Sequence, residues 1–329
     1  MTTASSLGVV AAAVQATPVF LDREATVERT CALVAEAAAR GAGLVVFPEA
    51  FIPGYPDWVW RCPAWDDFGL YDVLFDQAVD VPGPAVDRLC EAAAGAGAWI
   101  AVGVNERAAE SSTLYNTLLY VSPDGRLAGI HRKLMATGGE RTIWGQGDGS
   151  TLTVLDTPFG RLGGLICWEN YMPLARAAMW AQRVDVFLAP TWDSSDTWMA
   201  TLRHIAKEGR VHVVGTNTCM RSCDVPRALP GAERLYGGDD WMSPGNAAIV
   251  GPDGVLLAGP LVGETGILYA ELDVAAACRG RREFDPVGHY ARPDVFSLVV
   301  DDRRMRPVSF CTVADKPPPQ QEPSGTTQS

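Results

Sequence analysis

The stretch LGGLICWEN, residues 162–170, is followed by a run of helical periodicity that begins at Pro173. Its apolar first half predicts a buried strand over 162–166, which ends where the polar residues begin. Cys167 therefore stands at a strand-to-helix elbow, a turn that lifts a side chain out of a sheet and points backbone N–H groups at whatever it attacks. The dipole of the following helix predicts a lowered pKa for the Cys167 thiol. The alternative is a buried cysteine that only packs.

Short apolar runs alternate with longer amphipathic runs on both sides of this elbow. They predict strands over 8–14, 44–47, 99–104, 186–189 and 211–215, and helices over 22–40, 84–96, 173–183 and 198–209. Two hairpins, at 114–131 and 247–258, each turn on Pro-Asp-Gly, which indicates two similar halves. The alternation as a whole is typical of an α/β fold with layered sheets.

The chain is expected to form one domain. No linker composition interrupts residues 1–310, so we predict a single domain over 1–313. From residue 314 to residue 329 the composition changes to mainly Pro, Gln, Ser and Thr, which cannot bury enough apolar surface to offset the entropy of ordering. These last residues are predicted to be a disordered tail.

Charge and composition exclude several classes of function. Among 329 residues there are 27 Lys or Arg and 39 Asp or Glu, a net charge of −12, so we expect no binding to nucleic acid or to a membrane. Residues 1–21 lack the basic region of an export signal, and no run is long and apolar enough to span a bilayer. Eight scattered cysteines without a CxxC pair favour a reducing, cytoplasmic location.

Two more residues with reactive side chains end apolar strands. Glu49 follows the strand 44–47 among aromatic residues, so we expect a raised pKa and the role of a general base. Lys133 ends the strand 127–132. Taken singly, Glu49 could be a cap and Lys133 an exposed strand end. However, open α/β sheets gather their ligands at the edge where strands end, so Glu49, Lys133 and Cys167 can converge there.

Other chemistries find little support in the sequence. The four histidines lack the flanking residues of a papain-type site, which leaves a carboxylate as the base for the thiol. Cys219, Cys223 and His212 do not have the spacing of a closed zinc site. Because no phosphate-binding or dinucleotide-binding glycine pattern is present either, we expect neither a metal nor an organic cofactor.

Three blocks carry a family resemblance: FPEAFIPGYP at 47–56, HRKL at 131–134 followed by Thr137, Glu140 and Arg141, and GLICWEN at 164–170. They resemble the signature blocks of the nitrilase branch of the carbon–nitrogen hydrolase superfamily. Further similar stretches at 144–149, 204–210 and 288–296 extend the resemblance over roughly residues 7–300. It implies a four-layer αββα sandwich with a Glu–Lys–Cys catalytic site.

Carried over residue by residue, the resemblance makes Cys167 the nucleophile, Glu49 the base and Lys133 the group that stabilises charge on the substrate nitrogen. It makes Glu140 a second acidic residue that orients Lys133 or the water. The backbone N–H of Trp168 is a further expected donor to the developing anion. Ala136 departs from the family, whose nitrilases usually have Pro there, so we expect the loop with Glu140 to be less pre-ordered.

The resemblance favours an organic nitrile as substrate, because amidase relatives more often carry Tyr and Asp where this chain has Trp168 and Glu169. An amidase or carbamoyl-amide hydrolase, or a cyanide-hydrolysing enzyme, would use the same three residues. A catalytically silent scaffold is disfavoured because all three are present. Tyr55, Trp168 and Trp192 lie near the expected site in the sequence and are the candidates for substrate contacts.

We expect a homo-oligomer. The segments 57–75, 221–245 and 284–296 are not needed to complete the sandwich, and they carry aromatic and Arg residues that favour buried contact patches. The resemblance implies dimers that form through a helical face and can extend into spirals.

Overall fold

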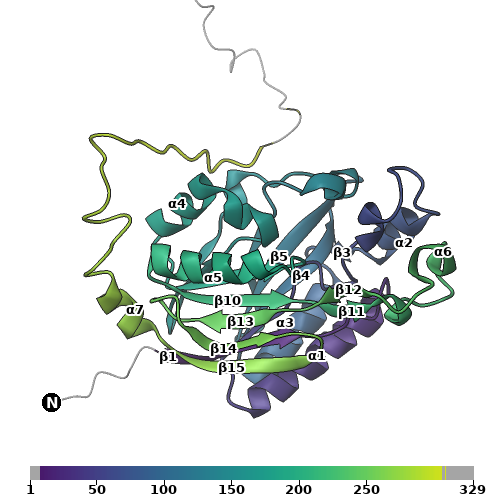
Figure 1. Cartoon of the computed structure of the whole chain (residues 1–329), viewed down its shortest axis with the longest axis horizontal. Coiled ribbons are helices and arrows are strands. Elements are labelled where there is room, and N and C mark those ends of the chain that lie inside the picture. Colours follow the sequence, from purple (N-terminus) through teal and green to yellow (C-terminus); the bar gives the residue numbers. More distant parts are fainter. Residues whose placement is uncertain (1–7, 306–307, 309–329) are drawn as a thin grey trace, which may run out of the picture.

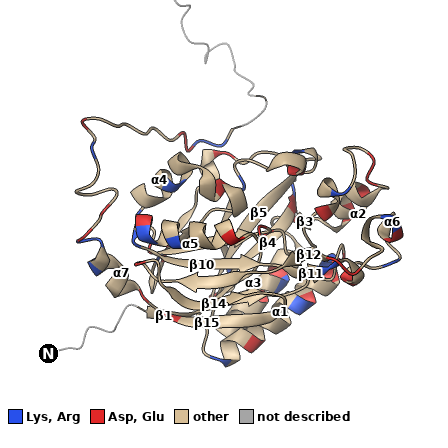
Figure 2. Cartoon of the chain, viewed as in Figure 1, with Lys and Arg blue, Asp and Glu red and all other residues tan. Residues whose placement is uncertain are grey.

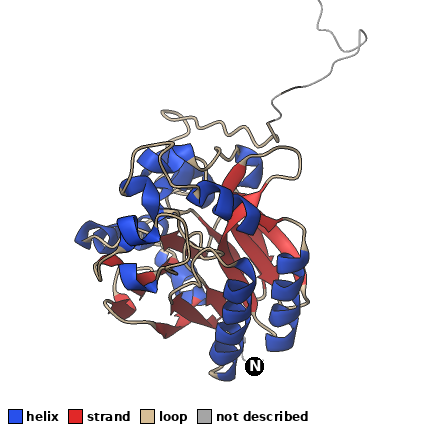
Figure 3. Cartoon of the chain, turned by 90° about the vertical axis from the view of Figure 1, so that its right-hand side faces the viewer, coloured by secondary structure: helices blue, strands red, loops and turns tan. Residues whose placement is uncertain are grey.

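The structure is a computed structural model that describes residues 8–305 and 308 (Figure 1). Two β-sheets pack against each other, and helices lie on both sides of the strands (Figure 3). The predicted four-layer αββα sandwich is confirmed. The tail predicted at 314–329 lies outside the described residues.

The first sheet has the strand order β15-β1-β2-β4-β5-β6, with β3 paired to β4. Its strands are β1 (Gly8–Gln15), β2 (Leu44–Val46), β3 (Val79–Asp80), β4 (Trp99–Arg107), β5 (Leu114–Ser122), β6 (Arg126–Arg132) and β15 (Gly266–Asp273). Helices α1 (Arg23–Ala39) and α3 (Pro84–Ala96) pack side by side on its outer face.

The second sheet has the order β14-β13-β10-β9-β8-β7. Its strands are β7 (Val154–Thr157), β8 (Gly160–Gly164), β9 (Val186–Thr191), β10 (His212–Asn217), β13 (Ala247–Val250) and β14 (Leu256–Leu261). Helices α4 (Pro173–Ala181) and α5 (Asp196–Gly209) cover its outer face.

The two sheets repeat one topology. β1, β2 and β4 run parallel and are followed by the antiparallel hairpin of β5 and β6. In the same way β8, β9 and β10 run parallel, and β13 and β14 follow as an antiparallel pair. The two similar halves predicted from the repeated Pro-Asp-Gly turns are therefore confirmed.

Alternation along β1 shows how the layers are filled. Ala12 and Val14 pack towards α1 and α3, whereas Ala11 and Ala13 face the second sheet. All four are fully buried, because successive side chains of a strand point to opposite faces and both faces of this strand are covered. Small alanines on the inner face let the two sheets approach closely.

The remaining elements lie at the ends of the sandwich. Segment 57–75 forms η1 (Asp57–Trp60) and the start of α2 (Leu70–Gln77). Segment 221–245 contains η5 (Ser222–Asp224) and α6 (Ala232–Tyr236), and a two-stranded sheet of β11 (Cys219–Arg221) and β12 (Trp241–Pro244) joins its two ends. The other short helices are η2 (Gly138–Thr142), η3 (Gly149–Thr151), η4 (Cys167–Tyr171) and α7 (Val274–Gly280).

Acidic and basic side chains are interspersed over the helices and loops (Figure 2). α1, for example, carries both signs along its length. Within residues 8–305, no helix has the length and apolarity needed to cross a membrane.

Candidate active site

Cys167 stands at the predicted elbow. It begins η4 directly after the apolar residues that follow β8, and its φ of +53° lies in the left-handed region that L residues rarely adopt. Backbone strain of this kind is a common property of functional sites. Its Sγ accepts a hydrogen bond from the hydroxyl of Thr191, at the end of β9, over 3.2 Å.

Glu49 reaches the same place from the first sheet. Beyond β2 the chain stays paired to β4, because the N–H of Phe47 donates to the carbonyl of Ala101 at 2.8 Å. A side chain at Gly103 could not be accommodated, since its Cβ would lie 2.3 Å from the carbonyl oxygen of Pro48. This glycine lets the turn that carries Glu49 pack directly on β4, where the carboxylate is fully buried.

Lys133 follows β6 and is buried, so it is not the exposed strand end that a single lysine usually is. Its Nζ donates to Oε1 of Glu49 and to Oε2 of Glu140, both at 2.7 Å. One ammonium thus bridges two buried carboxylates, which compensates part of the cost of burying all three charges.

The two glutamates differ in how many of their oxygens are occupied. Both oxygens of Glu140 are taken, because Oε1 accepts from the Tyr55 hydroxyl at 2.7 Å and Oε2 accepts from Lys133 and from the Thr137 N–H at 2.6 Å. In Glu49, Oε1 accepts from Lys133 and from Asn116 Nδ2, whereas Oε2 has no hydrogen-bond partner among the described residues. Glu49 therefore has an oxygen available for a proton.

Sequence reasoning missed Asn116 and Thr191. Asn116 is a buried polar residue in the otherwise largely apolar β5, and its amide fixes the Glu49 carboxylate at 2.7 Å. Thr191 ends β9 at the same edge of the sandwich as the elbow. A polar residue within an apolar strand, or at its carboxyl end, is the signal that could have found both.

Burial dominates the electrostatics. Burial raises the pKa of Glu49. The positive charge of Lys133 opposes this increase, and the negative charge of Glu140 adds to it. For Lys133 burial lowers the pKa, but the charges of Glu49, Cys167 and Glu140 outweigh it, so the amine stays protonated. Burial and the charge of Glu49 raise the pKa of Cys167 well above its usual value. The prediction of a lowered thiol pKa is wrong, because the thiol is enclosed beside two carboxylates and η4 is a single short turn.

We expect the rate of alkylation of Cys167 by iodoacetamide to rise steadily from pH 6 to pH 10 without a plateau near neutrality, because only the thiolate reacts and the raised pKa keeps it scarce. Peptide mass mapping would follow modification at this residue, with exposed Cys223 as an internal reference. A plateau at or below pH 7 would show instead a thiolate already formed in the resting protein.

A pocket of about 560 Å³ opens onto Cys167 and Glu140. Tyr55, Trp168 and Trp192, the predicted substrate contacts, line this pocket with Trp60 and Met242. The rings of Tyr55 and Trp192 stack at 4.4 Å, whereas Trp168 is 49% exposed and donates through Nε1 to Asp193 at 2.8 Å. The structure thus brings all seven predicted site residues to one region.

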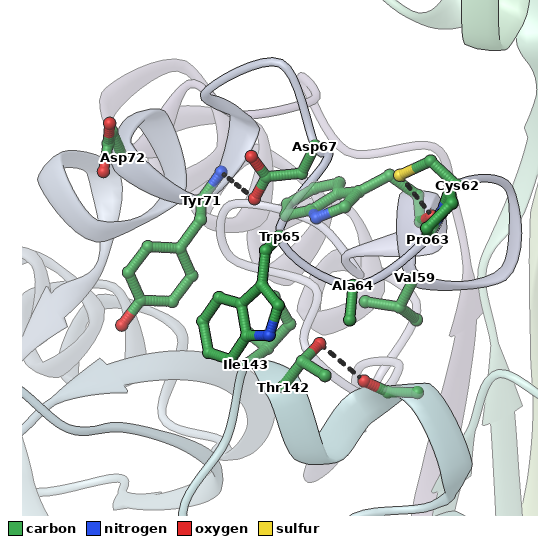
Figure 4. A pocket seen from close by; sticks show the side chains of 12 residues that line it. Val59, Cys62, Pro63, Ala64, Trp65, Asp67, Tyr71, Asp72, Thr142 and Ile143 are labelled. Atoms are coloured by element: carbon green, nitrogen blue, oxygen red, sulfur yellow. Dashed lines mark hydrogen bonds between the residues drawn. The ribbon is translucent and has the colours of Figure 1, made fainter.

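A second hollow, of about 470 Å³, lies between segment 58–72 and the residues Gly139, Thr142 and Ile143 (Figure 4). Trp65, Tyr71, Thr142 and Ile143 are among its lining residues, and Cys167 is not. Of these two pockets, the first is the one that Cys167 lines.

Among the residues that the structure describes, no three His, Cys, Asp or Glu side chains are grouped to hold a metal ion. Cys223 contacts Asp239 and His212 contacts the carbonyl of Asp273. The loop at Ala136 is held by Arg141, whose Nε donates to the Ala136 carbonyl at 3.1 Å.

Comparison with known proteins gives the family context. Residues 10–282 match the family described as carbon-nitrogen hydrolase. An aliphatic nitrilase of Sinorhizobium fredii is 48% identical over 300 residues, 89% of this chain and 95% of that protein. A bifunctional nitrilase/nitrile hydratase of Nicotiana tabacum is 43% identical over 320 residues, 93% of this chain and 90% of that protein.

Solved structures agree on the fold. A carbon-nitrogen hydrolase from Helicobacter pylori superposes with a TM-score of 0.68 at 22% identity, covering 87% of this chain and 96% of that one. The NitFhit protein of C. elegans gives a TM-score of 0.70 at 18% identity, covering 91% of this chain and 69% of that one.

Proposed function

The chain belongs to the carbon–nitrogen hydrolase family, and we propose that it is a nitrilase, which converts an organic nitrile and two waters to a carboxylic acid and ammonia. The observation that carries the proposal is the buried Lys133 ammonium held between Glu49 and Glu140, together with the pocket that Glu140 and Cys167 line. Relatives named as nitrilases, similar over most of the chain, support a nitrile as the substrate.

In the proposed reaction, Sγ of Cys167 attacks the nitrile carbon while the thiol proton passes to the free Oε2 of Glu49 and then to the nitrile nitrogen. The product is a thioimidate. Lys133, protonated and fixed by two carboxylates, stabilises negative charge that develops on the nitrogen. The backbone N–H of Trp168, next to the nucleophile, is a further donor at this point.

The thioimidate is then hydrolysed in two stages. Glu49 takes a proton from a water that adds to the carbon, and ammonia leaves with the proton it needs, which gives a thioester on Cys167. A second water, activated by Glu49 in the same way, releases the carboxylic acid and restores the thiol. Glu140 keeps the Lys133 ammonium in place throughout, because both its oxygens are occupied by donors.

An amidase or carbamoyl-amide hydrolase would use the same residues, so substrates must decide between them. Purified protein should be offered aliphatic, aromatic and arylacetic nitriles and cyanide, each organic nitrile beside its amide, with ammonia, acid and amide measured separately. We expect nitriles to give acid and ammonia in equal amounts. Hydrolysis of the amides with no consumption of any nitrile would contradict the proposal.

We also propose that the protein is a homo-oligomer located in the cytoplasm. Trp65 is 90% exposed and Phe296 76% exposed, both on segments outside the sandwich, and large exposed aromatic side chains favour contact surfaces. The described cysteines are all free, as in a reducing compartment. Light scattering during size-exclusion chromatography at micromolar protein should give a mass above one chain, and an active species of about 35 kDa would contradict this.

A further inference from the structure

We propose that Glu169, paired with His131, is a positioning residue that fixes the separation between Cys167 and Lys133. This inference rests on the proposed function for the identity of the substrate. The contacts of Glu169 that carry it do not depend on that function. Cys167 follows a strand of the second sheet and Lys133 a strand of the first, so their separation depends on how the two sheets are joined at this edge.

The Glu169 carboxylate joins them directly. Its Oε2 accepts the N–H of Ile166 at 2.6 Å, one residue before the nucleophile. Its Oε1 accepts the N–H of Leu134 at 2.6 Å, one residue after the lysine. A single side chain therefore holds the backbone beside both reactive groups.

His131 adds a third contact from the end of β6. Its Nε2 lies 3.0 Å from Oε2 of Glu169, and its Nδ1 lies 2.8 Å from the carbonyl oxygen of Thr151. The Thr151 carbonyl can only accept, and each oxygen of the Glu169 carboxylate already accepts a backbone N–H, so both ring nitrogens of His131 act as donors and carry hydrogen. The geometry thus describes an imidazolium–carboxylate pair, and both side chains are fully buried.

The pKa of His131 agrees with this description. Burial lowers it, but the charge and hydrogen bond of Glu169 outweigh burial, so the pKa is raised above its usual value.

A simple helix cap does not account for these contacts. As the third residue of η4, Glu169 would need only the Ile166 N–H to act as a cap. The bonds to Leu134 and His131 come from the other sheet, and His131 is in turn held by Thr151 of η3. The arrangement has the form expected where reacting groups must be held within fractions of an ångström.

Glu169→Gln tests the role, because a glutamine must turn its NH₂ towards a backbone N–H or towards His131. We expect kcat to fall about 100-fold with KM changed less than about threefold, the loss that a misplacement near 1 Å produces. Rates are taken per reactive site, counted by alkylation mapped to Cys167, so that unfolded protein does not contribute.

Asp185→Asn is the matched control. Asp185 is also a buried carboxylate that accepts a backbone N–H, from Arg161 at 2.9 Å, and pairs with a cation, Arg281, but it lies just before β9, at the opposite end of that strand from Thr191. We expect it to lower thermal stability and to leave kcat per reactive site unchanged. Equal losses of kcat in both variants, or a normal kcat in Glu169→Gln, would overturn the proposal.

If Glu169→Gln does not fold, His131→Asn decides the matter, with an expected loss in kcat of about 10-fold at similar KM; an unchanged kcat would overturn the proposal. The test is independent of the nitrile assignment. Should the wild-type protein hydrolyse amides and not nitriles, the proposed function fails, and the same variants are compared with the amide, since both reactions need the same placement of Cys167 and Lys133.

Discussion

Cys167→Ala is expected to abolish turnover while the protein stays folded. The reaction needs a covalent bond between Sγ of Cys167 and the substrate carbon, which an alanine side chain cannot form. The substitution removes a small side chain whose sulfur accepts a hydrogen bond from Thr191, so the melting temperature should change by only a few degrees. Ammonia release and a thermal melt, measured on the same preparation, check both halves of this expectation.

Cys219→Ala is the matched control for the nucleophile. Cys219 is also buried, but it lies in β11 and does not line the pocket that opens onto Cys167. It should keep wild-type turnover. Activity above background in Cys167→Ala, with the protein folded, would remove this residue from the mechanism.

Glu49→Gln is expected to lower kcat by about 1,000-fold, the contribution of a positioned general base, without destabilising the protein at neutral pH. Because burial raises the pKa of Glu49 in the native state, its contribution to stability is present below the unfolded value near 4.5 and is lost as the pH rises through the native pKa. Removing the charge should therefore leave the melting temperature equal or higher at pH 7, an advantage that disappears towards pH 4.

Comparison of Glu140→Gln with Glu49→Gln distinguishes the general base from the residue that holds Lys133 in place. Both oxygens of Glu140 are occupied by donors, so this residue is assigned to holding Lys133, and its variant should lose less turnover than Glu49→Gln. Kinetics of the two variants at one pH give the comparison. A larger loss at Glu140 would mean that the two roles are reversed.

The sequence allowed the strand ends that carry Glu49, Lys133 and Cys167 to be predicted, because each of these residues follows a predicted strand. The positions of Asn116 and Thr191 could not be predicted in this way, since their roles depend on which residues face them from neighbouring strands.

The direction of the pKa shift of the Cys167 thiol could not be predicted from the sequence either. A helix dipole can be anticipated from a turn, whereas enclosure beside two carboxylates is a property of the assembled sandwich. For the same reason, the unoccupied oxygen that supports Glu49 as the base and the contact of Glu169 with Leu134 appeared only once both sheets were in place.

The central claim, that Cys167 attacks a nitrile covalently, is tested most directly by quenching the reaction with acid within milliseconds and mapping the modified peptide by mass spectrometry. The account predicts an added mass that corresponds to the thioimidate or the acyl group, on Cys167 and absent from Cys167→Ala. Acid and ammonia formed from a nitrile with the added mass on any other side chain would contradict it.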